Sequence, residues 1–130
     1  FTVITSPDST LAKYWGHMDE TITAAGVTFK RPLLAAEAAS GQGSEELNNE
    51  QWNVPSHNDA MQTCVNNLPT KTELDALYIA GGVNSHGWPN GTGYYYWSIT
   101  SAPAGFYGIN MNNGQAFGLV ATDGQLVSCL

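Results

Sequence analysis

The segment Tyr94-Tyr95-Tyr96-Trp97-Ser98-Ile99-Thr100 is the clearest strand signal in the chain, because its aromatic and β-branched residues fit the pleated surface of a sheet. Downstream, Asn112-Asn113-Gly114 contains an Asn-Gly pair, which is typical of tight hairpins. Asp123-Gly124 is a second turn signal of the same kind. The expected strands are 94–100, Phe106–Met111, Gln115–Ala121 and Leu126–Leu130. The last third of the chain is therefore predicted to be an antiparallel meander.

A helix precedes this meander. Thr70-Lys71-Thr72-Glu73 is a capping box, in which the first and last side chains satisfy each other's free backbone N–H groups. From Leu74 onward, apolar and aromatic residues follow at i, i+3 and i+4 spacing, and Gly81-Gly82 supplies a left-handed stop. The sequence thus predicts a helix over 71–80. Helices followed by a sheet indicate the α+β class.

The first half of the chain carries weaker signals. Asp8 or Ser9 can cap a helix over Leu11–Met18, and Leu33–Ala39 is a second helical candidate. A turn at Gly26 leads into a strand at Val27-Thr28-Phe29. Residues 40–67 are polar and rich in turn formers. They form either a long irregular excursion or short elements that periodicity does not reveal.

Length and charge restrict the class of protein. The 130 residues suit one domain, and eleven acidic against four basic residues give a net charge of -7. This balance repels nucleic acid and anionic lipid, and no apolar run approaches the ~18 residues of a membrane span. The chain lacks an initiator Met, and Phe1-Thr2-Val3-Ile4 resembles the middle of a strand. We therefore expect a single domain, 1–130, taken from a longer protein.

Cys64 and Cys129 are the only cysteines. Their wide spacing does not match the close Cys-x-x-Cys pattern of redox or zinc sites. In an exported protein they would form one disulfide, whereas in a cytosolic protein they would be two buried thiols. The low Lys content, eleven Asn and fourteen Gly favour an exported, loop-rich domain.

The sequence offers no clear catalytic or metal site. Its three histidines are scattered, and the acidic pairs Asp19-Glu20 and Glu45-Glu46 are adjacent residues whose side chains point apart. There is no Gly-x-Ser-x-Gly nucleophile elbow, and Gly81-Gly82 lacks the lysine of a phosphate loop. We therefore expect a non-enzyme without a metal or cofactor.

An aromatic surface is the remaining candidate. Trp88 and Asn90 lie in a Gly-rich loop that leads into the tyrosines, and on a strand Tyr94 and Tyr96 share one face. Such residues anchor protein interfaces and stack on sugar rings, so these four are the candidate partner-binding residues. The alternative is that both faces of this strand are covered, one by the 71–80 helix and the other by the polar 40–67 segment.

Several motifs together resemble the C-terminal domain of the intimin/invasin family of bacterial outer-membrane adhesins. They are Tyr14-Trp15-Gly16-His17-Met18, Val27-Thr28-Phe29-Lys30-Arg31-Pro32-Leu33-Leu34-Ala35, Asn48-Asn49-Glu50-Gln51-Trp52, Leu68-Pro69-Thr70-Lys71-Thr72-Glu73-Leu74, Tyr95-Tyr96-Trp97-Ser98, Asn110-Met111-Asn112-Asn113-Gly114 and Cys129. These motifs span nearly the whole chain in the family's order.

The resemblance implies an α+β, C-type lectin-like fold with a Cys64–Cys129 disulfide. Family members carry an outer-membrane β-barrel, immunoglobulin-like domains and this domain at the distal tip. The tip typically contacts a host receptor, as invasin does with integrins and intimin with its translocated receptor. By similarity, the chain would be a virulence-associated adhesin tip outside a Gram-negative cell, preceded by immunoglobulin-like domains.

The chain departs from calcium-dependent lectins. It has Trp88-Pro89-Asn90 where those lectins have Glu-Pro-Asn or Gln-Pro-Asp, and it lacks Trp-Asn-Asp and a second disulfide. Calcium-dependent sugar binding is therefore not expected. Integrin binding would need an exposed acidic residue, for which Asp59 and Asp123 are candidates. We expect a monomeric, non-catalytic domain that binds a host cell-surface or secreted protein, integrin-like or other, with a calcium-independent carbohydrate-binding module as the alternative.

Overall fold

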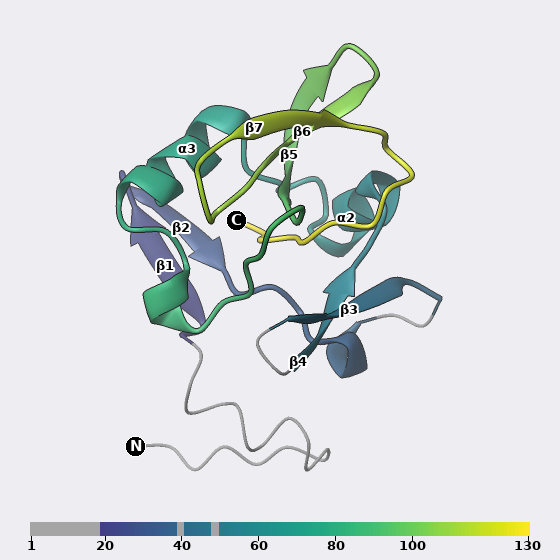
Figure 1. Ribbon diagram of the computed structural model, residues 1–130, viewed down its shortest axis with the longest axis horizontal. Coiled ribbons are helices and arrows are strands. Elements are labelled where there is room, and N and C mark those ends of the chain that lie inside the picture. Colours follow the sequence, from purple (N-terminus) through teal and green to yellow (C-terminus); the bar gives the residue numbers. More distant parts are fainter. Residues whose placement is uncertain (1–18, 39–40, 48–49) are drawn as a thin grey trace.

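The computed structural model describes residues 19–38, 41–47 and 50–130, and over these residues the chain forms seven strands and two α-helices (Figure 1). In chain order they are β1 (Thr21–Ala24), β2 (Val27–Lys30), β3 (Gly43–Leu47), β4 (Glu50–Val54), α2 (His57–Thr63), α3 (Lys71–Ile79), β5 (Tyr96–Ala102), β6 (Gly105–Ile109) and β7 (Ala116–Leu119). The α+β prediction is confirmed. The helix expected over Leu11–Met18 lies outside the described residues.

The C-terminal meander is present as an antiparallel sheet of β5, β6 and β7. The turn predicted at Asn112-Asn113-Gly114 joins β6 to β7, and the Gly114 N–H donates to the Asn110 carbonyl at 2.7 Å. Gly114 has a φ of +77°, and a Cβ there would lie 2.5 Å from the Tyr78 ring. Glycine is therefore required at this position for both its conformation and its contact with α3.

The last segment corrects the predicted meander. Leu126–Leu130 is not a fourth antiparallel strand, because Leu126 forms an isolated parallel bridge with Tyr96. The chain bends at Asp123-Gly124 and crosses the end of β4, where Gln125 N–H donates to the Pro55 carbonyl at 3.1 Å. The Leu126 N–H then donates to the Tyr95 carbonyl and the Trp97 N–H to the Leu126 carbonyl, both at 2.9 Å, so Asp123-Gly124 is a bend and not a hairpin.

β5 contains a bulge in its pairing with β6. Trp97 pairs with Gly108 and Ser101 with Phe106, so residues 98–100 lie opposite the single residue Tyr107. Ser98 Oγ donates to the Tyr107 carbonyl at 2.6 Å, which satisfies a backbone acceptor inside the bulge. The bulge turns Ile99 outward, and 36% of this residue is exposed.

The α3 helix confirms the prediction for 71–80 to within one residue. Thr70 Oγ1 accepts from the Glu73 N–H at 3.1 Å, and Glu73 Oε1 accepts from the Thr70 N–H at 2.8 Å. The helix ends before Gly81 and Gly82, both of which have positive φ.

Residues 40–67 hold short elements and not a long irregular excursion. They contain the β3–β4 hairpin and α2, which is capped by Ser56. The predicted helix at Leu33–Ala39 is wrong over its described residues, where only a 3-10 turn at Ala35–Glu37 forms. Leu34 is extended and bridges to Trp52, and this pairing with β4 prevents a helix from starting there. The strand predicted at Val27–Phe29 is confirmed as part of β2.

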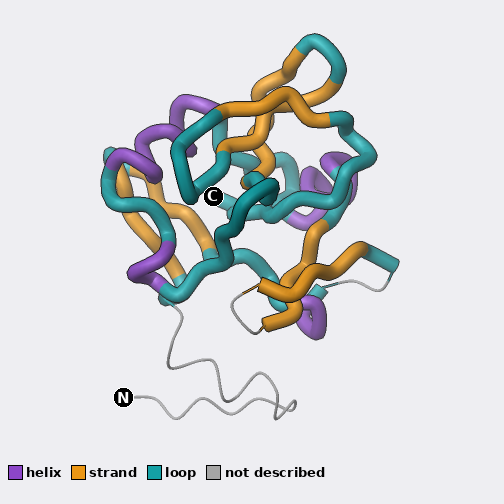
Figure 2. Tube along the Cα trace, viewed as in Figure 1, coloured by secondary structure: helices purple, strands orange, loops and turns teal. Residues whose placement is uncertain are grey.

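The core has two clusters, and β5 contributes a residue to each. Figure 2 shows α3 and α2 on either side of this strand. Tyr96 packs with Leu74 and Leu77 of α3, whereas Trp97 packs with Ala60 of α2. At Tyr96 and Trp97 both faces of β5 are thus covered, one by the helix and one by part of the polar 40–67 segment. For these two residues the alternative interpretation of the aromatic strand is confirmed.

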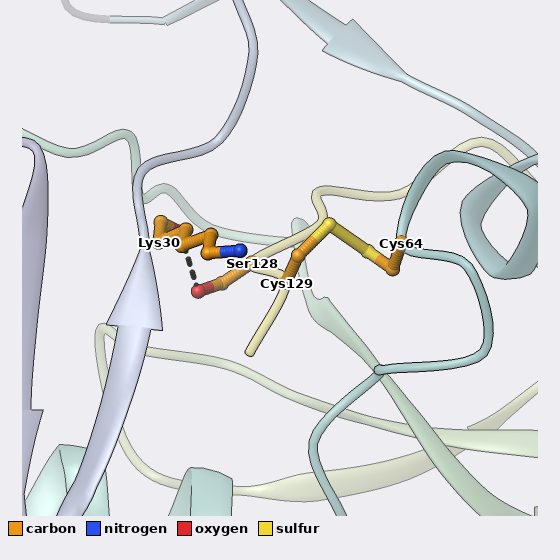
Figure 3. The surroundings of a disulfide bond; sticks show 4 residues. All are labelled: Lys30, Cys64, Ser128 and Cys129. Atoms are coloured by element: carbon orange, nitrogen blue, oxygen red, sulfur yellow. Dashed lines mark hydrogen bonds between the residues drawn. A yellow bond between two sulfur atoms is a disulfide. The ribbon is translucent and has the colours of Figure 1, made fainter.

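The Cys64–Cys129 disulfide joins the turn after α2 to the C-terminal segment (Figure 3), with a Cα–Cα distance of 5.1 Å. Hydrogen bonds reinforce this connection. Ser128 Oγ donates to the Lys30 carbonyl at 2.6 Å, and the Lys30 N–H donates to the Cys129 carbonyl at 2.7 Å. The disulfide prediction is confirmed, and it fixes the C-terminal segment against both β2 and the end of α2.

Arg31, the residue after β2, forms a buried ion pair with Glu37. Its side chain is 7% exposed, and its two terminal nitrogens donate to the Glu37 carboxylate at 2.9 and 3.0 Å. Glu37 also accepts from the Leu34 N–H at 2.8 Å. Burial alone would raise the pKa of Glu37, but the bonds from Arg31 and Leu34 outweigh it, so the pKa is lowered.

We predict that Arg31→Met lowers the free energy of unfolding by about 3 kcal/mol, because it leaves the half-buried Glu37 carboxylate without its partner. Lys30→Met is the matched control, since Lys30 is the adjacent cation and is exposed. Chemical denaturation measures both variants. Equal stability of the two variants would contradict a structural role for the Arg31 pair.

Candidate functional site

Two of the predicted aromatic anchors are core residues. Trp88 and Tyr96 are completely buried. Trp88 Nε1 donates to the Asp19 carbonyl at 2.7 Å, and Tyr96 OH donates to the Pro89 carbonyl at 2.5 Å. The interpretation of these two side chains as exposed partner contacts is corrected, because the loop folds back and encloses them.

Tyr94 and Asn90 are half-buried in the same loop. Strand β5 begins only at Tyr96, since the Tyr94 N–H donates to the Gly91 carbonyl at 3.2 Å and closes a turn. Tyr94 therefore does not share a strand face with Tyr96. Burial and the neighbouring Glu45 carboxylate raise the pKa of Tyr94. Asn90 Nδ2 donates to Asn84 Oδ1 at 3.1 Å, so its side chain serves the loop itself.

The two candidate carboxylates lie on neighbouring segments. Asp59 is half-buried in the first turn of α2, and Asp123 is exposed in the bend after β7. The His57 N–H at the start of α2 donates to the Ala121 carbonyl at 2.9 Å, which holds that bend against the helix. The structure thus brings the Asp59 and Asp123 segments together on one side of the molecule (Figure 1).

A hollow of about 460 Å³ lies between these segments and the β5 bulge. We name it the α2 pocket, and it is lined by His57, Asn58, Met61, Asn66, Ile99, Phe106 and Ala121. Helix α2 supplies one wall, and the bulge and β6 supply the other. Asp59 and Asp123 do not line the pocket, but each is within two residues of a residue that does.

His57 forms the inner wall of the α2 pocket and is buried. Its ring stacks on Phe106 with a centroid distance of 3.5 Å and meets the edge of Trp97 at 5.0 Å. Nε2–H donates to the Ser98 carbonyl at 2.8 Å, which ties α2 to the bulge. Burial lowers the pKa of His57 below 6.5, although the bond to Ser98 acts in the opposite direction.

This lowered pKa predicts a pH dependence of folding. Below about pH 6.5 the unfolded chain binds a proton at His57 more readily than the folded chain does, so the stability contributed by His57 is lost as the pH falls. The difference in unfolding free energy between the native domain and His57→Gln should therefore be larger at about pH 7.5 than at about pH 5.5. Denaturant titrations at both pH values measure it, and a pH-independent difference would contradict this assignment.

The turn after α2 separates this pocket from a second hollow. The second hollow has a volume of about 300 Å³, lies beside the disulfide and includes Lys30, Arg31 and Leu130 in its lining. Val65 stands on the turn with a φ of 50° and is 75% exposed. Such a conformation is unusual for a β-branched residue, and Val65 directly follows Cys64 of the disulfide.

Sequence reasoning missed the α2 pocket. Ile99 and Phe106 were each read as ordinary strand residues, and the bulge that exposes Ile99 has no signature in the sequence. Residues 57–63 lie in the segment where periodicity was uninformative. A feature that pointed to α2 was Ser56, which caps it by accepting from the Asp59 N–H at 3.3 Å.

The described part of the chain contains no group of three or more His, Cys, Asp or Glu residues that could hold a metal ion. None of the helices described here has the length and hydropathy needed to cross a membrane.

Comparisons with known proteins identify the family. The model of the InvE adhesion domain matches residues 7–130. The solved structure of the Yersinia pseudotuberculosis adhesin InvE, an invasin-family protein, superimposes with a TM-score of 0.80 and 40% sequence identity. The match covers 99% of this chain and 38% of that one, so this chain spans well under half of the adhesin's length. A search of curated proteins found no match. The chain belongs to the InvE adhesion domain family.

Proposed function

We propose that this domain is the tip of a bacterial surface adhesin and binds a host protein without catalysing a reaction. The observation that carries the proposal is the match to an adhesion domain over residues 7–130. The structural similarity to an invasin-family adhesin at 40% identity supports the same role. The proposal also includes attachment to an outer membrane, immunoglobulin-like domains before this one, a monomeric tip and a role in virulence.

The α2 pocket is the proposed contact surface. It combines apolar lining residues with a wall in which the His57 ring stacks on Phe106 beside the bulged β5 strand. Protein interfaces depend on such desolvated apolar centres more than on their polar rims. Of the residues proposed from the sequence, Asp59 and Asp123 stay as candidates beside this pocket, while Tyr94 and Asn90 belong to a separate loop.

The proposal can be tested with beads coated with the disulfide-bonded domain and added to cultured epithelial cells. We expect the beads to bind untreated cells, to lose binding after protease treatment of the cell surface, and to retain binding after enzymatic removal of glycans. Loss on glycan removal alone would support the carbohydrate-binding alternative. Beads that bind no better than beads coated with denatured domain would contradict adhesion by this domain.

A further inference from the structure

We infer that the outer edge of β7 is a second interaction surface, which pairs with an extended strand of another protein. This inference goes beyond the proposed function, because it concerns the backbone of β7 and not the α2 pocket. Three features carry it: the direction of the β7 backbone groups, the exposed apolar residues beside them and the lack of charge along the strand.

The backbone groups of β7 point alternately toward β6 and away from it. The Asn110 N–H donates to the Gln115 carbonyl at 2.9 Å, so these two residues face each other. Tyr107 is paired with Gly118, and the Tyr107 carbonyl accepts a hydrogen bond from the β5 side at 2.6 Å. Ala116 and Gly118 alternate with the residues that face β6. Their N–H and C=O groups therefore point away from the sheet.

The two edges of this three-stranded sheet differ. Along β5, the chain supplies its own partners: the Trp97 N–H donates to the Leu126 carbonyl at 2.9 Å. The Ile99 N–H donates to the Pro69 carbonyl at the same distance. Along β7, no other described residue bonds to the outward backbone groups. Gly118 has no side chain and is exposed, so its exposed surface is backbone that an added strand can reach.

Exposed apolar side chains flank this open edge. Phe117 in β7 is 57% exposed, and Val120, directly after the strand, is 53% exposed. The Phe117 ring lies 5.9 Å from the Tyr95 ring. A residue of an added strand that lies opposite Phe117 would cover this aromatic pair, and such cross-strand contacts favour aromatic and β-branched side chains. The edge thus offers both backbone hydrogen bonds and an apolar contact.

The sequence of β7 does not protect this edge. Exposed edge strands commonly carry charged residues or proline, which prevent pairing with another chain. Strand β3 follows this rule, since it contains Glu45 and Glu46. Residues 115–122, by contrast, contain neither a charged residue nor a proline. The edge is therefore open to the addition of a strand.

Charge favours a strand of a different protein over a second copy of this one. Each domain has a net charge of -7, so two copies repel each other as they approach. The fitting partner is an extended segment that has no proline at the positions facing β7, because those N–H groups donate to the outward carbonyls. It also carries an aromatic or β-branched residue opposite Phe117. This is recognition by strand addition, in which the backbone supplies affinity and alternate side chains supply specificity.

The first test measures hydrogen exchange of the free, disulfide-bonded domain by NMR. The N–H groups of Phe117 and Leu119 should exchange slowly, because they face β6, and those of Ala116 and Gly118 should exchange rapidly. Equal protection of the two sets would overturn the inference, because the edge would then already be covered.

The second test selects binders from a displayed library of random dodecapeptides on the same domain. Enriched peptides should be rich in β-branched and aromatic residues, and their binding should slow the exchange of the Ala116 and Gly118 amides. N-methylation at every second residue should abolish binding, whereas N-methylation of the intervening residues should not. The latter peptides are the matched control. Ala116→Pro removes an outward N–H and should weaken binding of the peptides about tenfold or more, with its fold checked by thermal unfolding.

Failed enrichment, an N-methylation pattern without this alternation, or native affinity of a folded Ala116→Pro would overturn the inference. Sedimentation velocity tests the second copy. Dimers of the native domain that Ala116→Pro abolishes would show that β7 pairs with itself and would overturn the assignment to a different protein. The bead assay on cells reports on adhesion independently, so either result can fail without the other.

Discussion

Replacing Cys64 and Cys129 together by serine is expected to lower the free energy of unfolding by about 4 kcal/mol. The disulfide closes a loop between residues 65 positions apart, so its loss increases the entropy of the unfolded chain. The C-terminal segment would also lose its covalent attachment beside Lys30 and Tyr96, where hydrogen bonds alone would remain. Chemical denaturation of the native domain and the double variant measures this difference.

Reduction of the native domain provides the control for this prediction. The reduced domain and the double serine variant should unfold at similar denaturant concentrations, since both lack the same cross-link. A loss smaller than about 1 kcal/mol in both would show that the hydrogen bonds of the C-terminal segment are sufficient without the disulfide.

Trp88→Ala is expected to cost about 4 kcal/mol of folding stability, because Trp88 is completely buried in the larger core cluster. The substitution leaves a cavity and removes the hydrogen bond from Nε1 to the Asp19 carbonyl. It should therefore act through folding and not through direct loss of a partner contact. Thermal or chemical unfolding measures this loss.

Phe117→Ala is the matched aromatic control, since Phe117 is exposed on β7. This variant should change the free energy of unfolding by less than about 1 kcal/mol. A Trp88→Ala domain with native stability and weakened binding to cells would contradict the burial of Trp88 and would restore it as a surface anchor.

Local sequence signals predicted the elements whose ends carry capping or turn-forming residues. The capping box at Thr70 and Glu73 located α3, and the Asn-Gly pair before Gln115 located the β6–β7 turn. In both cases a few neighbouring residues determine the geometry. The disulfide was also foreseen, because Cys64 and Cys129 have no other cysteine partner.

Features that depend on distant contacts were not predicted. The extended conformation of Leu34 is set by pairing with Trp52, and the parallel course of Leu126 is set by the path of the chain across β4. The burial of Trp88 and Tyr96 depends on how the loop before β5 folds back. The α2 pocket combines residues of α2, the turn after it, β5, β6 and the segment after β7, so no single stretch of sequence contains its signature.

The most direct test of the α2 pocket as the adhesive surface is the affinity of the fluorescently labelled domain for host cells. The native domain, Ile99→Arg and Ile79→Arg would be compared by flow cytometry over a range of concentrations. We predict that Ile99→Arg binds at least tenfold more weakly, since the pocket's apolar entrance would then carry a charge, and that Ile79→Arg binds like the native domain. Equal affinity of a folded Ile99→Arg and the native domain would contradict this assignment.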